Sequence, residues 1–304
     1  MVTTIDVTQA QYFIPEIWAQ AALPILRKNI VAVPRVTQDS DVAAFTVGDV
    51  LHIPYPGTLV ANDKAAGTAY TLQAPTGEAE VTVTLNKHKE ATFVVEDIVR
   101  AFANQDVRQR YVEAAAIALA EQVETDLITL LQTATNTDGT SAYGTDLTYA
   151  TMLKVREAMT TNLCPADGRS MIVHTKDSTK LLGDTALATY FAYSQTAGIS
   201  EGRLGRIAGF DVFESQVITS VAGTPVTTKD VAFRKDGAII AFRGLPEPPA
   251  GSGAFAANIR DPESGIVLRA LTAYRADLGG LQVTLEVLYG VAKLQEAKLM
   301  LVKS

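Results

Sequence analysis

Cysteine is almost missing from this chain of 304 residues, which contains only Cys164. One cysteine excludes an intrachain disulfide, so the fold does not depend on an oxidising compartment. The sequence has no Asn-x-Ser/Thr glycosylation acceptor, and its N-terminus lacks the charged start and apolar core of a signal peptide. The apolar run 114–120 is far too short to span a bilayer. We therefore expect a chain of cytosolic origin without a membrane partner.

Motifs that carry chemistry are also missing. There is no Walker-type phosphate loop and no dinucleotide-binding glycine motif, and the glycine-rich segment 202–209 fits neither spacing. His52, His88 and His174 stand at no metal-ligand spacing with one another or with the cysteine. His174 could act as a base with Asp177 nearby, but a structural histidine is favoured because no nucleophile accompanies it. We predict no catalytic, cofactor-binding or metal-binding residues, no cofactor and no enzyme activity.

Charge is sparse and slightly acidic. Only 19% of the residues are charged, whereas soluble domains typically have about 25%. The shortage suggests that more surface than usual is buried, for example between subunits, although a compact monomer with a large core stays open. The 33 acidic and 26 basic residues give a net charge of −7, which argues against a dedicated nucleic-acid binder.

The order of segments is what the sequence does contain. An irregular stretch, 1–42, is followed by alternating apolar residues that predict strands within 43–53 and 79–95. Between them lies a stretch of small and polar residues, 57–77. We interpret Ala43–Val95 as a long hairpin with a projecting tip. An isolated hairpin is marginally stable in water, so we expect the arm and the hairpin to be buried against other copies of the chain.

A long amphipathic helix is predicted next. Apolar residues recur every four positions from Val107 to Leu131, which indicates a helix of about 25 residues, nearly 40 Å long at ~1.5 Å per residue. Asp106 and Gln109 resemble a capping box at its start. A short helix is expected just before it, at 96–103.

The remaining sequence mixes helix and strand and then ends in strands. Residues 265–274 and 281–291 predict a hairpin, and alternation in its second strand indicates one buried face, most simply against the long helix. The other expected elements are helices at 149–161 and 176–182 and strands at 170–174, 209–214, 237–242 and 297–302.

This order of segments resembles the major capsid proteins of tailed double-stranded DNA bacteriophages, which have the Hong Kong 97-type fold. The resemblance spans nearly the whole chain and rests on hydrophobic and glycine patterns at 13–18, 93–99, 107–131, 207–215, 235–241 and 288–292. It implies an α+β fold in five segments. These are an N-terminal arm (1–45), an extended β-hairpin loop (46–95), a peripheral domain with a long spine helix (96–145), an α/β axial domain (146–260) and the C-terminal strands of the peripheral domain (261–304).

The function that the resemblance implies is mechanical. Hexamers and pentamers would tile an icosahedral shell around packaged DNA, with the protein located in the virion capsid after assembly in the host bacterial cytoplasm. An acidic container would enclose DNA with weak, non-specific contact. Because no long helical segment precedes the arm, a separate scaffolding protein is expected. A portal, a maturation protease and decoration proteins stay open as further partners.

Candidate inter-subunit contacts follow from the same resemblance. Some members of the family join subunits through Lys–Asn links, and Lys64 lies in the tip where such a lysine would sit, although a solvated lysine is favoured. The candidate contact residues are Phe13, Ile14, Trp18, Tyr55, Lys64, Tyr70, Lys87 and Lys89.

Two alternatives are kept. An encapsulin-like shell of a cellular compartment shares the fold but needs a cargo-docking surface near the N-terminus and encloses no genome. A two-domain soluble enzyme, with 148–260 as its substrate domain, predicts a small discrete particle and a deep pocket with perturbed titratable groups.

Overall fold

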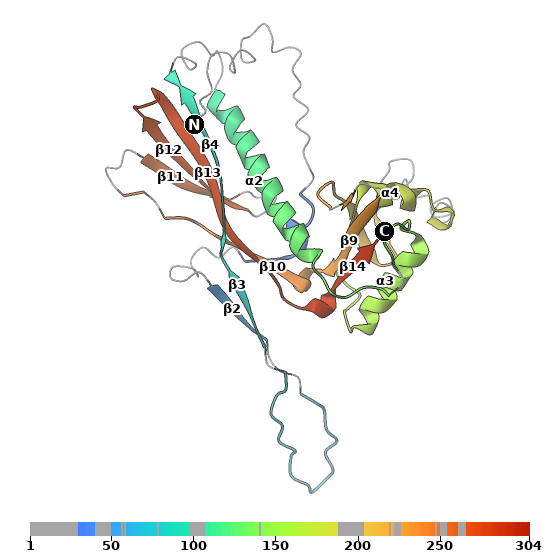
Figure 1. The fold of residues 1–304 in the computed structure, drawn as a ribbon. Helices are drawn as coiled ribbons and strands as arrows, with labels where there is room; N and C mark the ends of the chain where they lie inside the picture. The colour runs from blue at the N-terminus through green and yellow to red at the C-terminus, as the bar shows by residue number, and fades with distance from the viewer. Residues whose placement is uncertain are drawn as a thin grey trace.

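The computed structural model of the chain shows two β-sheets joined by a long helix, with a hairpin loop projecting away from both (Figure 1). It describes residues 30–39, 50–55, 57, 59–77, 79–97, 107–139, 141–187, 204–218, 220–221, 226–246, 248–249, 254–260 and 266–304.

The larger sheet is organised around one long strand of 14 residues, β13. On one side, the first part of β13 pairs with β12 and the last part with β10, while β4 pairs along its other side. Hydrogen-bonded pairing connects the strands in the sequence β1 (Thr37–Asp39), β10 (Ala238–Arg243), β13 (Gly280–Lys293), β12 (Val267–Arg275) and β11 (Ala254–Arg260), with β4 (Lys87–Glu96) along the opposite edge of β13.

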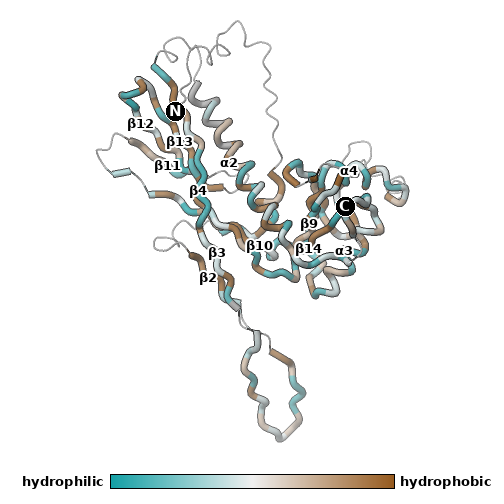
Figure 2. Tube along the Cα trace, viewed as in Figure 1, coloured by the Kyte–Doolittle hydropathy of each residue, from teal (hydrophilic) through white to brown (hydrophobic). Residues whose placement is uncertain are grey.

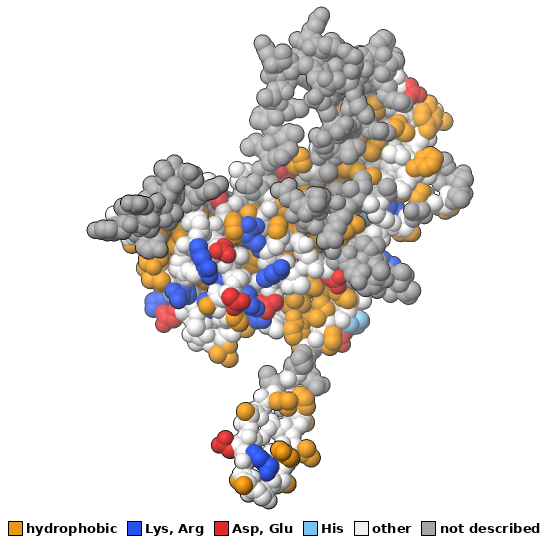
Figure 3. Space-filling model, turned by 180° about the vertical axis from the view of Figure 1, so that it is seen from behind, with side chains coloured by type: hydrophobic (Ala, Val, Ile, Leu, Met, Phe, Trp, Pro, Cys, Tyr) orange, Lys and Arg blue, Asp and Glu red, His pale blue; other side chains and the backbone are white. Residues whose placement is uncertain are grey.

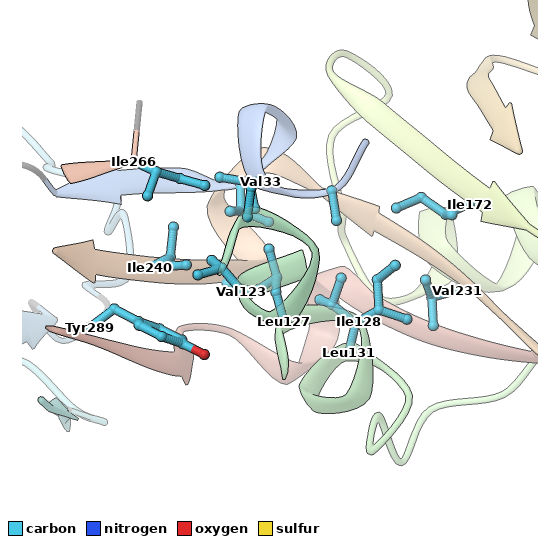
Figure 4. Close-up of a cluster of buried hydrophobic side chains, with 14 of the residues drawn as sticks. Val33, Val123, Leu127, Ile128, Leu131, Ile172, Val231, Ile240, Ile266 and Tyr289 are labelled. Atoms are coloured by element: carbon cyan, nitrogen blue, oxygen red, sulfur yellow. The ribbon is translucent and has the colours of Figure 1, made fainter. Parts of the chain in front are cut away.

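Helix α2 (Val107–Leu131) lies across one face of this sheet and begins and ends at the residues that the apolar spacing predicts. Its buried side chains recur at helical spacing and meet Tyr289 and neighbouring residues of β13 (Figure 4). The Tyr289 hydroxyl donates to Asp126 of α2 at 2.5 Å. These contacts confirm the prediction that β13 packs against the helix. Burial of each leucine or valine side chain stabilises the fold by about 1.5–3 kcal/mol, so this packing is a major part of the core.

The smaller sheet has helices packed against it and forms a second core. Met152, Val155 and Met159 of α3 and Leu181 of α4 are buried there. The strands, in order, are β14 (Leu299–Lys303), β9 (Thr227–Arg234), β5 (Arg169–Val173), β7 (Phe210–Glu214) and β6 (Arg206–Ile207), with β8 (Ser220–Val221) against β9; the helices are α3 (Tyr149–Thr161) and α4 (Thr175–Leu182). The helices and strands expected in this region are confirmed.

The two cores touch where α2 ends. Ile172 and Val231 of the smaller sheet join the cluster of buried side chains around Leu127 and Leu131 (Figure 4). Hydrophobic stretches of β9, β10 and β14 meet near this end of the helix (Figure 2). The long helix therefore packs against the larger sheet along its length and against the smaller sheet at its C-terminal end.

After α2 has led the chain from the larger sheet to the smaller one, the chain passes between the sheets again at the 3₁₀ helices η4 (Lys235–Gly237) and η5 (Glu296–Lys298). Asp236 binds both crossings together, because it pairs with Arg234 at 2.5 Å and with Lys298. Burial opposes the charge of Asp236, but the hydrogen bonds from Lys298 and Arg234 hold the pKa of its carboxyl below the usual value.

The two sheets extend across the segment boundaries that the sequence suggests. The strands β10 and β11 (238–243 and 254–260) belong to the larger sheet rather than to an axial segment that reaches residue 260, and β14 at the C-terminus belongs to the smaller sheet. The chain crosses back between sheets, and hydrophobic alternation within a strand carries no information about the sheet that it joins.

The projecting hairpin is shorter than predicted. Strands β2 (Val50–Tyr55) and β3 (Ala79–Thr84) pair antiparallel, and this ladder ends at Thr84. The chain then turns into β4, which pairs with β13, so the expectation that the hairpin extends to Val95 is wrong for its last strand. Strands β3 and β4 each have one buried face, and for this reason the alternation of apolar and polar residues continues through the turn between them. Four expected features lie outside the described residues: the arm apart from residues 30–39, the strand within 43–49, the helix at 96–103 beyond Asp97, and the cap at Asp106.

Gly290 allows β13 to pass beneath the turn between β3 and β4. A Cβ at this position would lie 2.3 Å from the carbonyl oxygen of Thr84 and 3.3 Å from the Cα of Leu85. Because the obstructing atoms are backbone, no side-chain rotation relieves the clash. We expect Gly290→Val to lower the free energy of unfolding by about 3 kcal/mol or to prevent folding, measured by urea denaturation. Leu288→Val is the control on the same strand, with an expected loss of less than about 1.5 kcal/mol; equal losses would contradict the explanation.

Candidate subunit interface

The loop between the two strands of the hairpin lies away from both cores (Figure 1). Every residue from 59 to 77 is exposed. The hydrogen bonds within the described loop are local: the Gln73 side chain accepts from the Val60 N–H at 3.0 Å and donates to the Val60 carbonyl oxygen at 2.7 Å. A segment with no buried side chain gains little from folding onto its own subunit, because apolar burial provides most of the driving force.

Large apolar side chains gather on this loop. Leu59, Val60, Tyr70 and Leu72 are 65%, 71%, 82% and 95% exposed. Figure 3 shows hydrophobic side chains on the loop, seen from behind, and Figure 2 shows a hydrophobic stretch in the same place. We call these four residues the tip cluster. Exposed apolar groups concentrated on a projection are typical of a surface that another molecule covers.

The larger sheet exposes further apolar side chains at its end. Phe255 of β11 and Tyr274 of β12 are 78% and 57% exposed. The register places Phe255 opposite Thr272, two residues from Tyr274, so both side chains lie on one face. It is the same face that α2 covers further along the sheet. Tyr274 and Ala270 are four residues apart on β12, so their side chains point the same way, and Ala270 pairs with Leu285, which packs in the core against α2.

The lysine of the tip has a local structural role. The Lys64 ammonium donates to the carbonyl oxygens of Ala65, at 3.0 Å, and Thr68, and it lies 5.1 Å from the centroid of the Tyr70 ring. Lys64 therefore holds the turn at the tip together with Tyr70. Both residues lie within the tip, as the sequence predicts, while their contact with another subunit stays a prediction.

The other candidate contact residues are distributed more widely. Tyr55 ends β2 and is half-buried; burial, together with the negative charge of Asp236, raises the pKa of its phenol. Lys87 pairs with Asp126 of α2 at 3.0 Å, so it contributes to packing within the subunit. Lys89 is the next residue on the same face of β4. The candidates in the arm, Phe13, Ile14 and Trp18, lie outside the described residues.

Glu124, a buried carboxylate of α2, holds the backbone of residues 31–33 by hydrogen bonds. Glu124 is 1% exposed and accepts backbone N–H groups from Val31, Ala32 and Val33 at 2.8, 2.6 and 3.1 Å. These N–H groups stand at the start of the 3₁₀ helix η3 (Val33–Arg35), where no earlier carbonyl can accept them. We call this arrangement the Glu124 anchor.

Arginine supplies the charge that Glu124 needs. Burial raises the pKa of Glu124, whereas the three backbone hydrogen bonds and the positive charge of Arg35 oppose the rise. The Arg35 guanidinium also lies 3.3 Å from the centroid of the Phe213 ring on β7, so the anchor also contacts the smaller sheet. Sequence reasoning missed Glu124, although an acidic residue inside the apolar stripe of a helix, between Ala120 and Ile128, was a usable signal.

The described residues show no arrangement typical of an active site. No group of three His, Cys, Asp or Glu side chains among them could hold a metal ion. The His174 imidazole accepts the Lys176 N–H at 3.1 Å and caps α4, which confirms its interpretation as a structural histidine. A hollow of about 560 Å³ beside Tyr149, Leu187 and Arg206 has no carboxylate, cysteine or histidine among its described lining residues. No helix in the described part of the chain has the length and hydrophobicity to cross a membrane.

A long helix on a β-sheet, a second α/β core and a projecting hairpin together define the Hong Kong 97-type fold of shell proteins. Solved structures share it. The chain is similar to a structure from Mycobacterium phage Che8 (20% identity, TM-score 0.65, covering 95% of this chain and 97% of that one). It is also similar to the capsid of cyanophage P-SCSP1u (15% identity, TM-score 0.67, covering 93% of this chain and 90% of that one). A third similar structure is the head of Helicobacter pylori bacteriophage KHP40 (11% identity, TM-score 0.57, covering 92% of this chain and 89% of that one). No match was found among curated protein sequences.

The family model for phage capsid protein matches residues 78–282. The chain therefore belongs to the phage capsid protein family. It is a structural protein of the phage capsid. The predicted α+β fold is confirmed, and so is the prediction that the chain is a phage capsid protein.

Proposed function

We propose that the chain assembles into hexamers and pentamers, and that these close the shell around packaged double-stranded DNA. The observation that supports this most directly is the tip cluster, with apolar side chains between 65% and 95% exposed on a loop that projects from the subunit. In a shell, this loop lies on a neighbouring subunit, which buries the cluster. A contact between two different surfaces of the same chain is heterologous, and repeated around an axis it generates closed rings.

The segments take the following roles in this proposal. Residues 1–45 form an arm on neighbouring subunits, and its base is held by the Glu124 anchor. The extended loop is centred on β2, β3 and residues 57–77. The larger sheet with α2 is the peripheral domain, and the smaller sheet with α3 and α4 is the axial domain that surrounds the capsomer axis. This assignment follows sheet membership.

The proposed contact with DNA is weak and non-specific. The net charge of −7 disfavours tight binding to phosphates, and a wall that bound DNA strongly would obstruct packaging. The protein has no catalytic activity of its own in this proposal. In the same proposal, a separate scaffolding protein guides assembly in the host bacterial cytoplasm.

Negative-stain microscopy of the purified full-length chain, with and without a candidate scaffolding protein, tests the proposal. The expected particles are rings with six or five subunits and closed shells. Virions should yield double-stranded DNA that nuclease cannot reach until the shell is opened, which separates a genome container from an encapsulin-like shell. Uniformly monomeric protein across a range of salt and pH, or shells that contain protein cargo and no DNA, would contradict it.

A further inference from the structure

The axial domain contains two buried carboxyl groups, those of Asp177 and Asp230. Asp177 stands in the first turn of α4 and Asp230 in β9, and both residues are 0% exposed. Both residues bond to the backbone of His174, whose N–H donates to Asp230 Oδ1 and whose carbonyl oxygen accepts the Asp177 N–H at 3.0 Å, and the negative charge of Asp177 acts on Asp230. Two adjacent negative charges removed from water repel each other strongly, so the pair requires an explanation.

In the described part of the chain, one oxygen of each carboxyl group has a hydrogen-bond donor and the other has none. Asp177 Oδ2 accepts from the hydroxyls of Thr228, at 2.5 Å, and Ser304, at 2.8 Å. Asp230 Oδ1 accepts the backbone N–H of His174 at 2.8 Å. Asp177 Oδ1 and Asp230 Oδ2 are buried and accept from no donor in the described part of the chain.

The charges around the pair compensate one negative charge. Lys176 Nζ lies 3.9 Å from Asp177 Oδ1 and donates to the Val226 carbonyl oxygen at 3.0 Å. Glu214, at the end of β7, accepts the hydroxyls of Thr175 and Ser178 on α4, so it adds negative charge nearby. The backbone oxygen of Ser304, the last residue of the sequence, accepts the Thr228 N–H at 2.8 Å and supplies no cation. One ammonium therefore faces two carboxyls.

We propose that Asp177 and Asp230 share one proton in the folded protein, as a carboxyl–carboxylate pair, and that loss of this proton at raised pH weakens the attachment of the C-terminal strand to the axial domain. The shared proton lies between the two oxygens that otherwise have no donor, so it satisfies both. Through Thr228 and Ser304, the pair joins α4 and β9 to the end of β14. Deprotonation places two charges in the same dry site and disrupts this junction.

The direction of the pH dependence follows from the burial of Asp230. Burial raises the pKa of Asp230 well above its usual range, the negative charge of Asp177 adds to the rise, and the hydrogen bond from His174 opposes it. An acid with a raised pKa in the folded state stabilises that state fully below its unfolded pKa, about 4 for aspartate. This contribution is lost as pH rises from there through the raised pKa. The axial domain should therefore become less stable toward alkaline pH.

Replacing one carboxyl by an amide tests the proposal. In Asp230→Asn, the amide N–H₂ donates permanently to Asp177 and the amide oxygen still accepts from His174. We expect the full-length variant to unfold about 2–4 °C above wild type near pH 8, and to lose the decline in unfolding temperature seen for wild type between about pH 5 and pH 9. Asp146→Asn is the matched control, because Asp146 forms an exposed pair with Lys180 at 3.0 Å; it should keep the wild-type pH dependence.

Infrared spectroscopy observes the proton itself. Wild type at neutral pH should show the carbonyl band of a protonated carboxyl, and the band should be missing from Asp230→Asn but present in Asp146→Asn. Should Asp230→Asn fail to fold, Asp177→Asn makes the same amide substitution from the other side and gives the same two readouts. A wild-type spectrum without a protonated carboxyl band, or an amide variant with the pH dependence of wild type, overturns the proposal.

Discussion

Shells should fail to close when the loop between Gly57 and Gly77 is shortened, while the subunit itself folds normally. Residues 59–77 are all exposed, so a deletion of 59–75 with a short glycine–serine link removes no core. The ends can be joined, because a Cβ on Gly57 would lie 2.8 Å from Cβ of Pro75 and 2.9 Å from the Thr76 carbonyl oxygen. The unfolding temperature of the isolated subunit should change by less than about 2 °C, since surface changes away from special features alter stability little.

The loss of closure should be near complete, because each subunit loses the contact that buries four large apolar side chains. At roughly 1.5–3 kcal/mol for each fully buried side chain, this is a large part of the free energy available to one subunit contact. Sedimentation and negative-stain microscopy would count closed shells. The paired substitutions Tyr70→Ser and Leu72→Ser should reduce shell yield in the same direction, whereas Thr71→Ser, between them, should leave the yield unchanged.

Two outcomes would contradict this role of the loop. If the shortened subunit unfolds, the loop belongs to the subunit core. If the shortened subunit closes shells at the wild-type yield, the tip cluster is not buried between subunits.

Removing the carboxylate of the Glu124 anchor should cost about 3–5 kcal/mol of unfolding free energy, which is the range for breaking a buried, hydrogen-bonded charge. In Glu124→Ala, the N–H groups of Val31, Ala32 and Val33 lose their acceptor inside the core, and Arg35 loses the negative charge that compensates its own. Guanidinium denaturation of the full-length chain would measure the change.

Two controls separate the charge from the shape of the anchor. Glu124→Gln keeps one carbonyl oxygen as an acceptor but turns an N–H₂ toward backbone donors, so we expect an intermediate loss. Thr129→Ala removes an exposed side chain of α2 that bonds only to Thr125 of the same helix, at 2.7 Å, and should be nearly neutral. A Glu124→Ala loss no larger than that of Thr129→Ala would show that the anchor contributes nothing to stability.

Local patterns predicted the elements of this fold well. The four-residue spacing of apolar side chains indicated both ends of α2, and β7 and β12 lie within one or two residues of their expected positions. These patterns arise because one face of each element is buried. Residues on one face recur every two positions in a strand and every three to four positions in a helix. The same patterns misassigned β4, since its alternation matches equally well a strand of the hairpin and a strand of the sheet.

The candidate interface was predicted in outline only. The small, polar composition of 57–77 indicated a projecting loop, and the tip cluster lies there. Lys87 was expected at a subunit contact, yet its ammonium pairs with Asp126 of α2, which stands 39 positions later, and spacing along the chain cannot reveal such a partner.

The sequence by itself determined the helices, most strands and the absence of chemical motifs, because composition and short-range periodicity suffice for these. The tertiary structure alone decided which strands pair, where Glu124 finds its three donors and why Asp177 and Asp230 stand together. Those contacts join residues as far as 93 positions apart for Glu124 and 53 for the two aspartates, and they exist only after the chain has packed. A buried carboxylate is stabilised by specific donors in three dimensions, and no periodic pattern encodes their positions.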